Sequence, residues 1–141
     1  MNRNNVSVDH IGIATNSLDD SEVFWKMLGF VQDIDDEIVE EQGVKVRYLS
    51  SPENTSDDAT RIELLEPTGK ETPIGRFLEK RGPGVQQICI RVDDINSTLN
   101  YLIEAGIELI DKTPKKGANG ALIAFVHPKS TGGVLVELSQ H

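Results

Sequence analysis

The sequence contains an internal repeat, and this repeat limits the folds that the chain can adopt more than any other feature. Three pairs of segments match in the same order along the chain: Val8–Ile13 with Val85–Ile90, Leu28–Phe30 with Ala105–Ile107, and Ile62–Leu64 with Val136–Leu138. The first two pairs are displaced by 77 residues (8 to 85) and the third by 74 (62 to 136). We therefore interpret the chain as a tandem duplication whose period is too long for a solenoid of short repeats.

Each copy predicts the same order of elements, namely a strand, a helix and three further strands. In the first copy we expect strands near 7–14, 30–39, 44–50 and 60–66 and a helix over 18–28. In the second copy we expect strands near 85–92, 107–111, 121–127 and 133–139 and a helix over 95–105. The expected fold class is α+β: one 141-residue domain built from two tandem βαβββ modules, about 6–67 and 84–139, with a short linker helix over about 72–81.

Residues that commonly begin or end helices mark the expected helix ends. Ser17 is expected to cap the first helix, and Gly29 to end it. In the second copy Asp93 or Asp94 is expected to be the cap, and Gly106 the end. The apolar stripe of the first helix is predicted to hold four residues: Leu18, Phe24, Trp25 and Leu28.

Charge and cysteine content exclude some classes of protein. The net charge is −9, so the chain is a poor candidate for binding nucleic acid, since contacts to phosphates dominate that affinity. No apolar run approaches the roughly 20 residues that span a bilayer, and the N-terminus lacks the apolar core of a signal peptide. A single cysteine, Cys89, excludes an internal disulfide, and we expect a cytoplasmic protein that does not bind membranes.

Strand alternation places one polar residue on the same face at four equivalent points of the repeat. Each predicted strand has an aliphatic face that can pack on the helix of its module. The opposite faces carry the polar residues His10, Glu63, Gln87 and Glu137. One imidazole and three oxygen donors suit a divalent metal ion with open positions for water or substrate, provided that the two modules pair with these faces opposed.

Several longer stretches of the chain resemble a known family. They are Val8–Ala14, Glu41–Val44, Ile62–Pro67, Thr72–Leu78, Gly117–Gly120 and His127–Leu138. Together they resemble the vicinal-oxygen-chelate superfamily, which has a glyoxalase-like fold with a cupped mixed sheet around a metal site. Within it the chain is most similar to the methylmalonyl-CoA epimerase family. The resemblance covers nearly the whole chain, and the stretch His127–Leu138 is its most specific part.

The resemblance implies a function and roles for individual residues. It implies metal-dependent epimerisation of methylmalonyl-CoA, in which loss of the C2 proton gives an enolate that the metal stabilises. It places the metal ligands on His10, Glu63, Gln87 and Glu137, the catalytic carboxylate on Glu41, and a candidate second base on Glu137. The expected metal is cobalt, manganese, nickel or zinc. An acyl-CoA substrate and a homodimer are the expected partners, and the CoA phosphates are expected near a basic group comprising Lys112, Lys115, Lys116 and Lys129.

The chain departs from the family pattern at two places. Gln86-Gln87 stands where the family has His-His, so an amide replaces one imidazole ligand. Asn119 and Ala121 stand where the family has His and Lys, which changes the residues available for substrate recognition.

These departures leave two alternatives open. One is a glyoxalase I-like lactoylglutathione lyase, whose donor set is similar. The other is a metal-free protein that binds small molecules, as in bleomycin resistance. An extradiol dioxygenase does not fit, because its iron site needs two histidines and one carboxylate.

Overall fold

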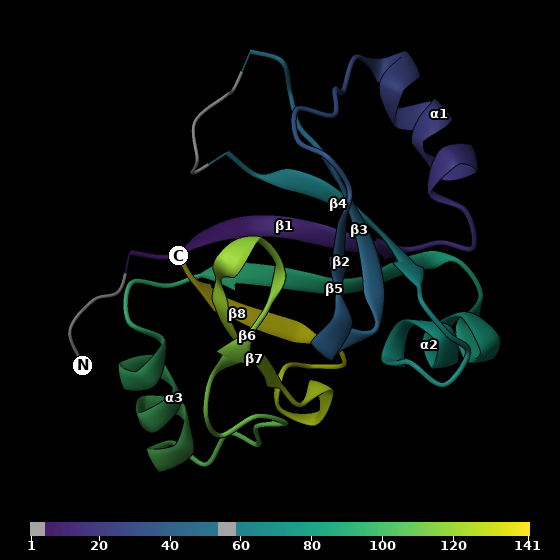
Figure 1. The fold of residues 1–141 in the computed structure, drawn as a ribbon. Helices are drawn as coiled ribbons and strands as arrows, with labels where there is room; N and C mark the ends of the chain where they lie inside the picture. The colour runs from purple at the N-terminus through teal and green to yellow at the C-terminus, as the bar shows by residue number, and fades with distance from the viewer. Residues whose placement is uncertain (1–4, 54–58) are drawn as a thin grey trace. The chain divides into compact units, whose positions relative to one another are not determined.

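The structure is a computed structural model that describes residues 5–53 and 59–141 (Figure 1). The strands are β1 (Ser7–Ala14), β2 (Glu37–Val39), β3 (Val44–Leu49), β4 (Arg61–Pro67), β5 (Gly84–Arg91), β6 (Lys115–Lys116), β7 (Leu122–Val126) and β8 (Val136–Gln140). The helices are α1 (Leu18–Leu28), α2 (Pro73–Arg81) and α3 (Ile95–Glu104). Three short 3₁₀ turns are η1 (Glu40–Gln42), η2 (Ala118–Gly120) and η3 (Pro128–Ser130). No helix in the described ranges is long and apolar enough to cross a membrane.

The α+β class with two βαβββ modules is confirmed, but the second strand of the second module is β6 at Lys115–Lys116 rather than the expected strand near 107–111. The chain forms two compact units, one over His10–Gln86 and the other over Gln87–His141 together with the described residues up to Asp9. The side chain of Asp9 explains the second grouping, because it pairs with Arg91 at 3.0 Å and with His141 at 3.2 Å. That the two modules make a single domain stays a prediction.

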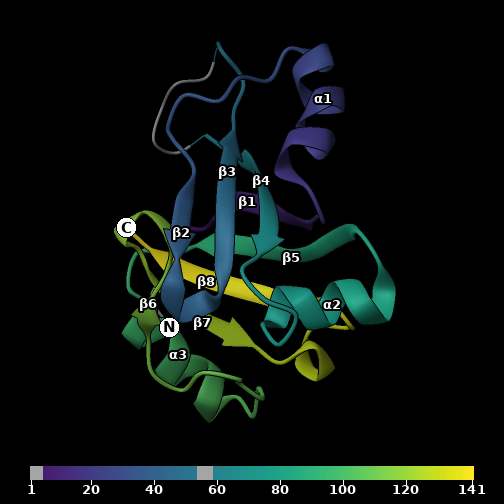
Figure 2. The same ribbon diagram turned by 45° about the vertical axis from the view of Figure 1, so that its right-hand side comes forward.

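In the first module the strands lie in the order β2-β3-β4-β1. β3 is antiparallel to both β2 and β4, and Figure 2 shows these three strands side by side. β1 runs parallel to β4, with Gly12 opposite Glu63. The connection from β1 to β4 passes through α1 and the β2–β3 hairpin. It is therefore long enough for β1 and β4 to pair in parallel beside the antiparallel pair β3–β4.

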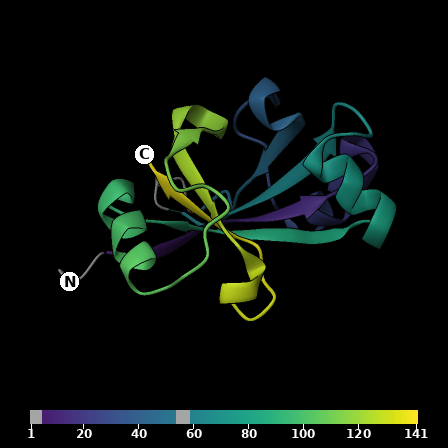
Figure 3. The same cartoon turned by 90° about the horizontal axis from the view of Figure 1, so that it is seen from below.

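The second module has the same arrangement, in the order β6-β7-β8-β5. β5 is parallel to β8, with Cys89 opposite Glu137, and β8 is antiparallel to β7, with Phe125 opposite Glu137. The last strand, β8, is yellow in Figure 3 and runs to the C-terminus marked there. Corresponding strands therefore bring Glu63 and Glu137 to the same place in each module.

The helices begin at the predicted caps. Ser17 Oγ accepts from Asp20 N at 3.1 Å, and Thr72 Oγ1 accepts from Gly75 N at 3.1 Å. Of the two candidates in the second module, Asp94 is the cap, and it accepts from Ser97 N at 3.0 Å. Gly29 ends α1 with φ of 111°, a conformation that a side chain would strain.

The core of the first module lies between α1 and the aliphatic faces of its strands. Leu18, Leu49 and Leu64 are buried there, and Trp25 packs against them. Two of the four residues predicted for the apolar stripe of α1 do not face the core, since Phe24 is 58% and Leu28 62% exposed. These two residues lie on the outer side of the helix with Val23 and Met27, because α1 is apolar on two sides rather than one.

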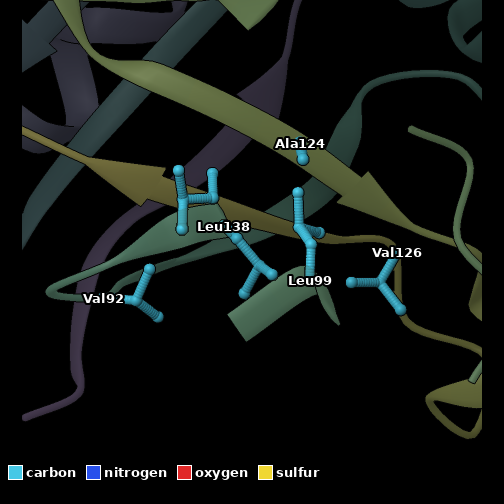
Figure 4. Packing of buried hydrophobic residues seen from close by; sticks show 6 residues of the cluster. Val92, Leu99, Ala124, Val126 and Leu138 are labelled. Atoms are coloured by element: carbon cyan, nitrogen blue, oxygen red, sulfur yellow. The ribbon is translucent and has the colours of Figure 1, made fainter. Parts of the chain in front are cut away.

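The core of the second module lies under α3. Ile95 and Leu99 of α3 are buried against the strands, as Figure 4 shows for Leu99. Other members of this cluster are Val92, Ala124, Val126 and Leu138. Both modules thus bury the aliphatic faces that strand alternation predicts, which leaves the opposite faces to carry the polar residues.

Three predicted strands are shorter than expected. The strand expected over 107–111 is reduced to a single bridge, Leu109 with Val126, because the carboxylate of Asp111 accepts from Phe125 N at 2.9 Å in place of a neighbouring strand. β2 spans three residues rather than the expected 30–39, where only Val31 forms a bridge outside β2. β8 begins three residues later than predicted, after two glycines with positive φ.

A buried arginine joins α1 to the sheet of the first module. The guanidinium of Arg47 on β3 donates from Nε and Nη2 to the two carboxylate oxygens of Asp36, at 2.9 and 2.7 Å. Its Nη1 reaches Asp19 of α1 at 2.8 Å and Glu22 of α1 at 3.2 Å. These hydrogen bonds lower the pKa of the Asp36 carboxyl below its usual value, with charge attraction from Arg47 adding to the effect. The arginine therefore ties the helix, β3 and the segment before β2 together.

Candidate functional site

The four predicted metal donors are all buried on the faces opposite the helices. His10, Glu63, Gln87 and Glu137 are between 5% and 7% exposed. Charged and amide side chains are rarely buried to this degree unless they are paired or bind a ligand. In each module the structure brings the two predicted donors of that module into contact.

In the first module the donors are His10 on β1 and Glu63 on β4. The Nδ1 atom of His10 lies 3.0 Å from Oε2 of Glu63. Glu63 thus holds the imidazole through Nδ1. A histidine held by a carboxylate through one nitrogen has the orientation that metal-binding histidines usually have.

In the second module the donors are Gln87 on β5 and Glu137 on β8. The amide Nε2 of Gln87 donates to Oε1 of Glu137 at 2.7 Å. The amide nitrogen is thus directed at the carboxylate, and Oε1 of Gln87 is the atom that can act as a metal ligand. Gln87 on β5 therefore takes the position in the second module that His10 on β1 takes in the first.

A tyrosine and a further glutamate share the buried face of the first module, and the sequence analysis missed both. Tyr48 on β3 lies directly opposite Glu63, and its hydroxyl donates to Oε1 of Glu37 on β2 at 2.5 Å. Burial raises the pKa of Tyr48 well above its usual range, and the hydrogen bond to Glu37 and the charge of Glu63 add to the effect. The strand register, which places Tyr48 opposite Glu63, is the signal that could have identified this pair.

The remaining predicted catalytic residue, Glu41, lies apart from these contacts. It is exposed in η1, between β2 and β3. The adjoining end of β3 pairs with the far end of β4, with Val44 opposite Pro67, whereas Tyr48 is opposite Glu63. The structure therefore does not bring Glu41 next to His10 and Glu63.

The predicted basic group is only partly available to an anionic ligand. The ammonium of Lys115 pairs with Asp111 at 3.2 Å and lies 5.3 Å from the centre of the Phe125 ring. The other three lysines, Lys112, Lys116 and Lys129, are exposed. An exposed ammonium can meet a phosphate without first breaking a salt bridge.

The chemistry of the donor set fits a divalent cation. Each module buries one carboxylate, Glu63 or Glu137, beside one imidazole or amide, and a cation would offset the cost of burying such a carboxylate. Imidazole nitrogen, amide oxygen and carboxylate oxygen are all ligand types that divalent ions take. The residues therefore fit the metal ion that the family resemblance implies.

Comparisons with known proteins agree with this description of the fold. A model of the Glyoxalase/Bleomycin resistance protein/Dioxygenase superfamily matches residues 9–125. The mitochondrial methylmalonyl-CoA epimerase of Dictyostelium discoideum is 39% identical over 135 residues, which are 94% of this chain and 77% of that protein. The structure of a hypothetical protein from Bacillus halodurans C-125 is similar with a TM-score of 0.88, at 38% identity over 97% of this chain and 95% of that one.

A further solved structure combines the fold with a bound ligand. It is a variant of the Streptomyces coelicolor methylmalonyl-CoA epimerase in complex with 2-nitronate-propionyl-CoA. The TM-score is 0.87 at 34% identity, over 95% of this chain and 93% of that one. The glyoxalase-like fold is confirmed by these matches, and the chain belongs to the glyoxalase/bleomycin resistance protein/dioxygenase superfamily and, within it, to the methylmalonyl-CoA epimerases, which are isomerases.

Proposed function

We propose that this chain epimerises methylmalonyl-CoA by moving a proton at C2 in a metal-dependent reaction. The observation that supports this most directly is the burial of two donor pairs, His10–Glu63 and Gln87–Glu137, at corresponding positions of the repeat. Membership of the epimerase family supplies the substrate class, since the related Streptomyces enzyme binds an acyl-CoA analogue.

The family resemblance assigns His10, Glu63, Gln87 and Glu137 as the ligands of one divalent ion. Enzymes of this superfamily typically bind such an ion, and we propose cobalt, manganese, nickel or zinc. When bound, a divalent ion stabilises negative charge that develops on a carbonyl oxygen next to the reacting carbon. The contacts of His10 with Glu63 and of Gln87 with Glu137 orient the donors before the ion arrives.

Inversion at C2 needs a base on one side of the carbon and an acid on the other. We assign the carboxylate of Glu137 to one of these roles. The family resemblance assigns the other role to Glu41. One carboxylate removes the C2 proton and the other returns a proton to the opposite side, so that no proton is gained or lost overall. Because Glu41 is exposed, the Glu41→Gln variant is a direct test of its role.

The CoA part of the substrate is assigned to the exposed lysines Lys112, Lys116 and Lys129. Attraction between these side chains and the CoA phosphates is weakened by salt. The KM for methylmalonyl-CoA should therefore rise with ionic strength, and it should rise less in a Lys116→Gln variant if Lys116 contributes.

The test of the proposed function is deuterium uptake at C2 of methylmalonyl-CoA in D₂O. The protein is stripped of metal and reloaded with cobalt, manganese, nickel or zinc. Uptake that depends on metal and is lost in His10→Ala would support the proposal. A protein that holds metal but gives no uptake would refute it, and activity with methylglyoxal and glutathione would then support the lyase alternative.

A homodimer is part of the same proposal. The outer face of α1 (Val23, Phe24, Met27 and Leu28) exposes four large apolar side chains, the most exposed being Met27 at 82%. This is on the order of 500 Å² of apolar surface, as large as the patches that mark interaction sites on soluble proteins. Two such faces would bury about 1,000 Å², near the lower limit for a specific interface.

Charge along α1 favours a second copy of the chain as the partner. Acidic residues, Asp19 and Asp20, lie in the first turn, and Lys26 lies in the last. If two α1 helices pack antiparallel, the acidic turn of each meets the partner's Lys26, and the helix dipoles oppose each other favourably. Sedimentation of wild type and Met27→Glu tests this proposal: we expect a dimer that the variant dissociates, and a monomeric wild type would contradict it. A cytoplasmic location stays a prediction.

A further inference from the structure

We infer that Glu37 and Tyr48 form a positioning pair that fixes the Glu63 carboxylate for metal binding. The inference rests on the metal site of the proposed function, and it adds two residues that this site does not include. It concerns the first module only, where all the residues involved lie on β1, β2, β3 and β4.

Strand register places the pair on the buried face with the donors. Tyr48 is opposite Glu63 across the antiparallel pair β3–β4, and residues directly opposite each other point to the same side of a sheet. Glu37 is opposite Val46 across β2–β3, and Val46 shares its side with Tyr48 because side chains alternate along a strand. The side chain of Glu37 then reaches the hydroxyl of Tyr48, which donates to its Oε1 at 2.5 Å.

The position of the Tyr48 ring is fixed from several sides. The residue is 1% exposed, so its ring is surrounded by protein atoms. The guanidinium of Arg61 lies 6.0 Å from the ring centre, and Glu37 holds the hydroxyl at the far end of the ring. A ring held at both its face and its hydroxyl has little freedom to move, and it lies next to the side chain of Glu63.

The fixed position of the ring matters because it adds to the contact that His10 makes with Glu63. Its carboxylate contacts His10 on one side, and Tyr48 stands on the other in the strand order β1-β4-β3. A ligand carboxylate must keep one orientation to bind a metal tightly, and any other orientation it adopts lowers the affinity. Groups that orient metal ligands in this way typically change metal affinity by 10- to 100-fold when they are removed.

The experiment measures the dissociation constant for Co²⁺ by competition with a chromogenic chelator. Tyr48→Phe removes only the hydroxyl, which holds the ring rather than Glu63 itself, so we expect the affinity to fall by about 10-fold, the lower end of the range for groups that orient metal ligands. Tyr101→Phe is the matched control, because Tyr101 is the other tyrosine of the chain and lies exposed on α3; its affinity should not change. The visible spectrum of bound Co²⁺ provides a second readout, since it changes when the ligand geometry changes.

Variants of the partner separate positioning from simple loss of structure. Glu37→Gln keeps an oxygen acceptor for Tyr48 and should retain most of the affinity, whereas Glu37→Ala should resemble Tyr48→Phe. The double variant Glu37→Ala/Tyr48→Phe should lose little more than either single variant, because the two residues act as one unit. Melting temperatures without metal show whether each variant is folded.

The outcomes separate this inference from the proposed function. Folded Tyr48→Phe that binds Co²⁺ as tightly as wild type, with an unchanged spectrum, would overturn the inference alone. A wild type that binds Co²⁺ but does not exchange the C2 proton would overturn the proposed function and leave the inference open to the same affinity test. A wild type that binds no metal at any concentration tested would overturn both.

Discussion

Replacing Arg47 by Met should destabilise the protein, because it removes a buried guanidinium that pairs with three carboxylates. Methionine keeps most of the apolar length of the side chain and removes the guanidinium. The change leaves the carboxylate of Asp36, which is 18% exposed, with the amide of Gln32 as its remaining hydrogen-bond donor among the described residues, at 2.8 Å. It also removes the ion pairs that join β3 to Asp19 and Glu22 of α1.

The magnitude follows from how deeply each partner is buried. Breaking a fully buried ion pair by removing one partner costs about 3–5 kcal/mol, and an exposed pair contributes about 0–1 kcal/mol. The Asp36 carboxylate lies between these limits, and Asp19 is 85% exposed and counts as a surface pair. We therefore expect a loss of about 2–3 kcal/mol, equivalent to a fall of roughly 5–10 °C in melting temperature for a domain of this size.

Urea unfolding at pH 7, followed by the fluorescence of Trp25, measures the loss. The matched control is Lys26→Met, which removes a pair with Glu22 at 3.0 Å in which the lysine is 46% exposed, and it should change stability by less than about 1 kcal/mol. A loss below about 0.5 kcal/mol for Arg47→Met, with an unchanged m-value, would refute the reasoning.

The contribution of Asp36 should also depend on pH. Arg47 lowers the pKa of this carboxyl in the folded protein below its ordinary value of 3.8. A lowered pKa stabilises the folded state when the pH is above the unfolded value, and this stabilisation disappears as the pH falls through the folded value. The stability difference between wild type and Asp36→Asn should therefore be full at pH 5 and above and should shrink below about pH 4.

Three further changes test other parts of the fold by the same urea assay. Leu99→Ala should cost about 3–5 kcal/mol, because Leu99 is fully buried on the side of α3 that packs on the strands, and a loss below about 1 kcal/mol would contradict its place in the core. Ser17→Ala should cost about 1 kcal/mol by removing the cap of α1, and Ser17→Asp should not. Gly75→Ala should be poorly tolerated, since its Cβ would lie 2.5 Å from the carbonyl oxygen of Gly69; a variant as stable as wild type would mean that α2 can shift away.

Local signals in the sequence predicted the helices closely. Ser17 and Gly29 bound α1 at the predicted residues, because a cap hydroxyl and a residue with positive φ satisfy requirements that involve only neighbouring residues. The donors His10, Glu63, Gln87 and Glu137 were predicted to lie on the faces away from the helices, and they do, since alternation along a strand fixes the side of each residue. Their roles as metal ligands stay predictions.

Features that depend on distant parts of the chain were predicted less well. Periodicity on α1 could not show which of its two apolar sides meets the sheet, and Phe24 and Leu28 are on the other side. The strand expected over 107–111 failed because Asp111, a residue with low strand preference, occupies the donor of Phe125 that a ladder would need. Tyr48 and Glu37 meet only because two hairpin registers align, and no local pattern encodes that.

The outermost strands of the two modules have a consequence for the behaviour of the protein at high concentration. β2 and β6 end the strand order of their modules and span only three and two residues, and both residues of β6 are lysines. An exposed strand edge is a template for aggregation, and short or lysine-bearing edges remove most of that template. The protein should therefore resist fibril growth through its sheet edges even when it is concentrated.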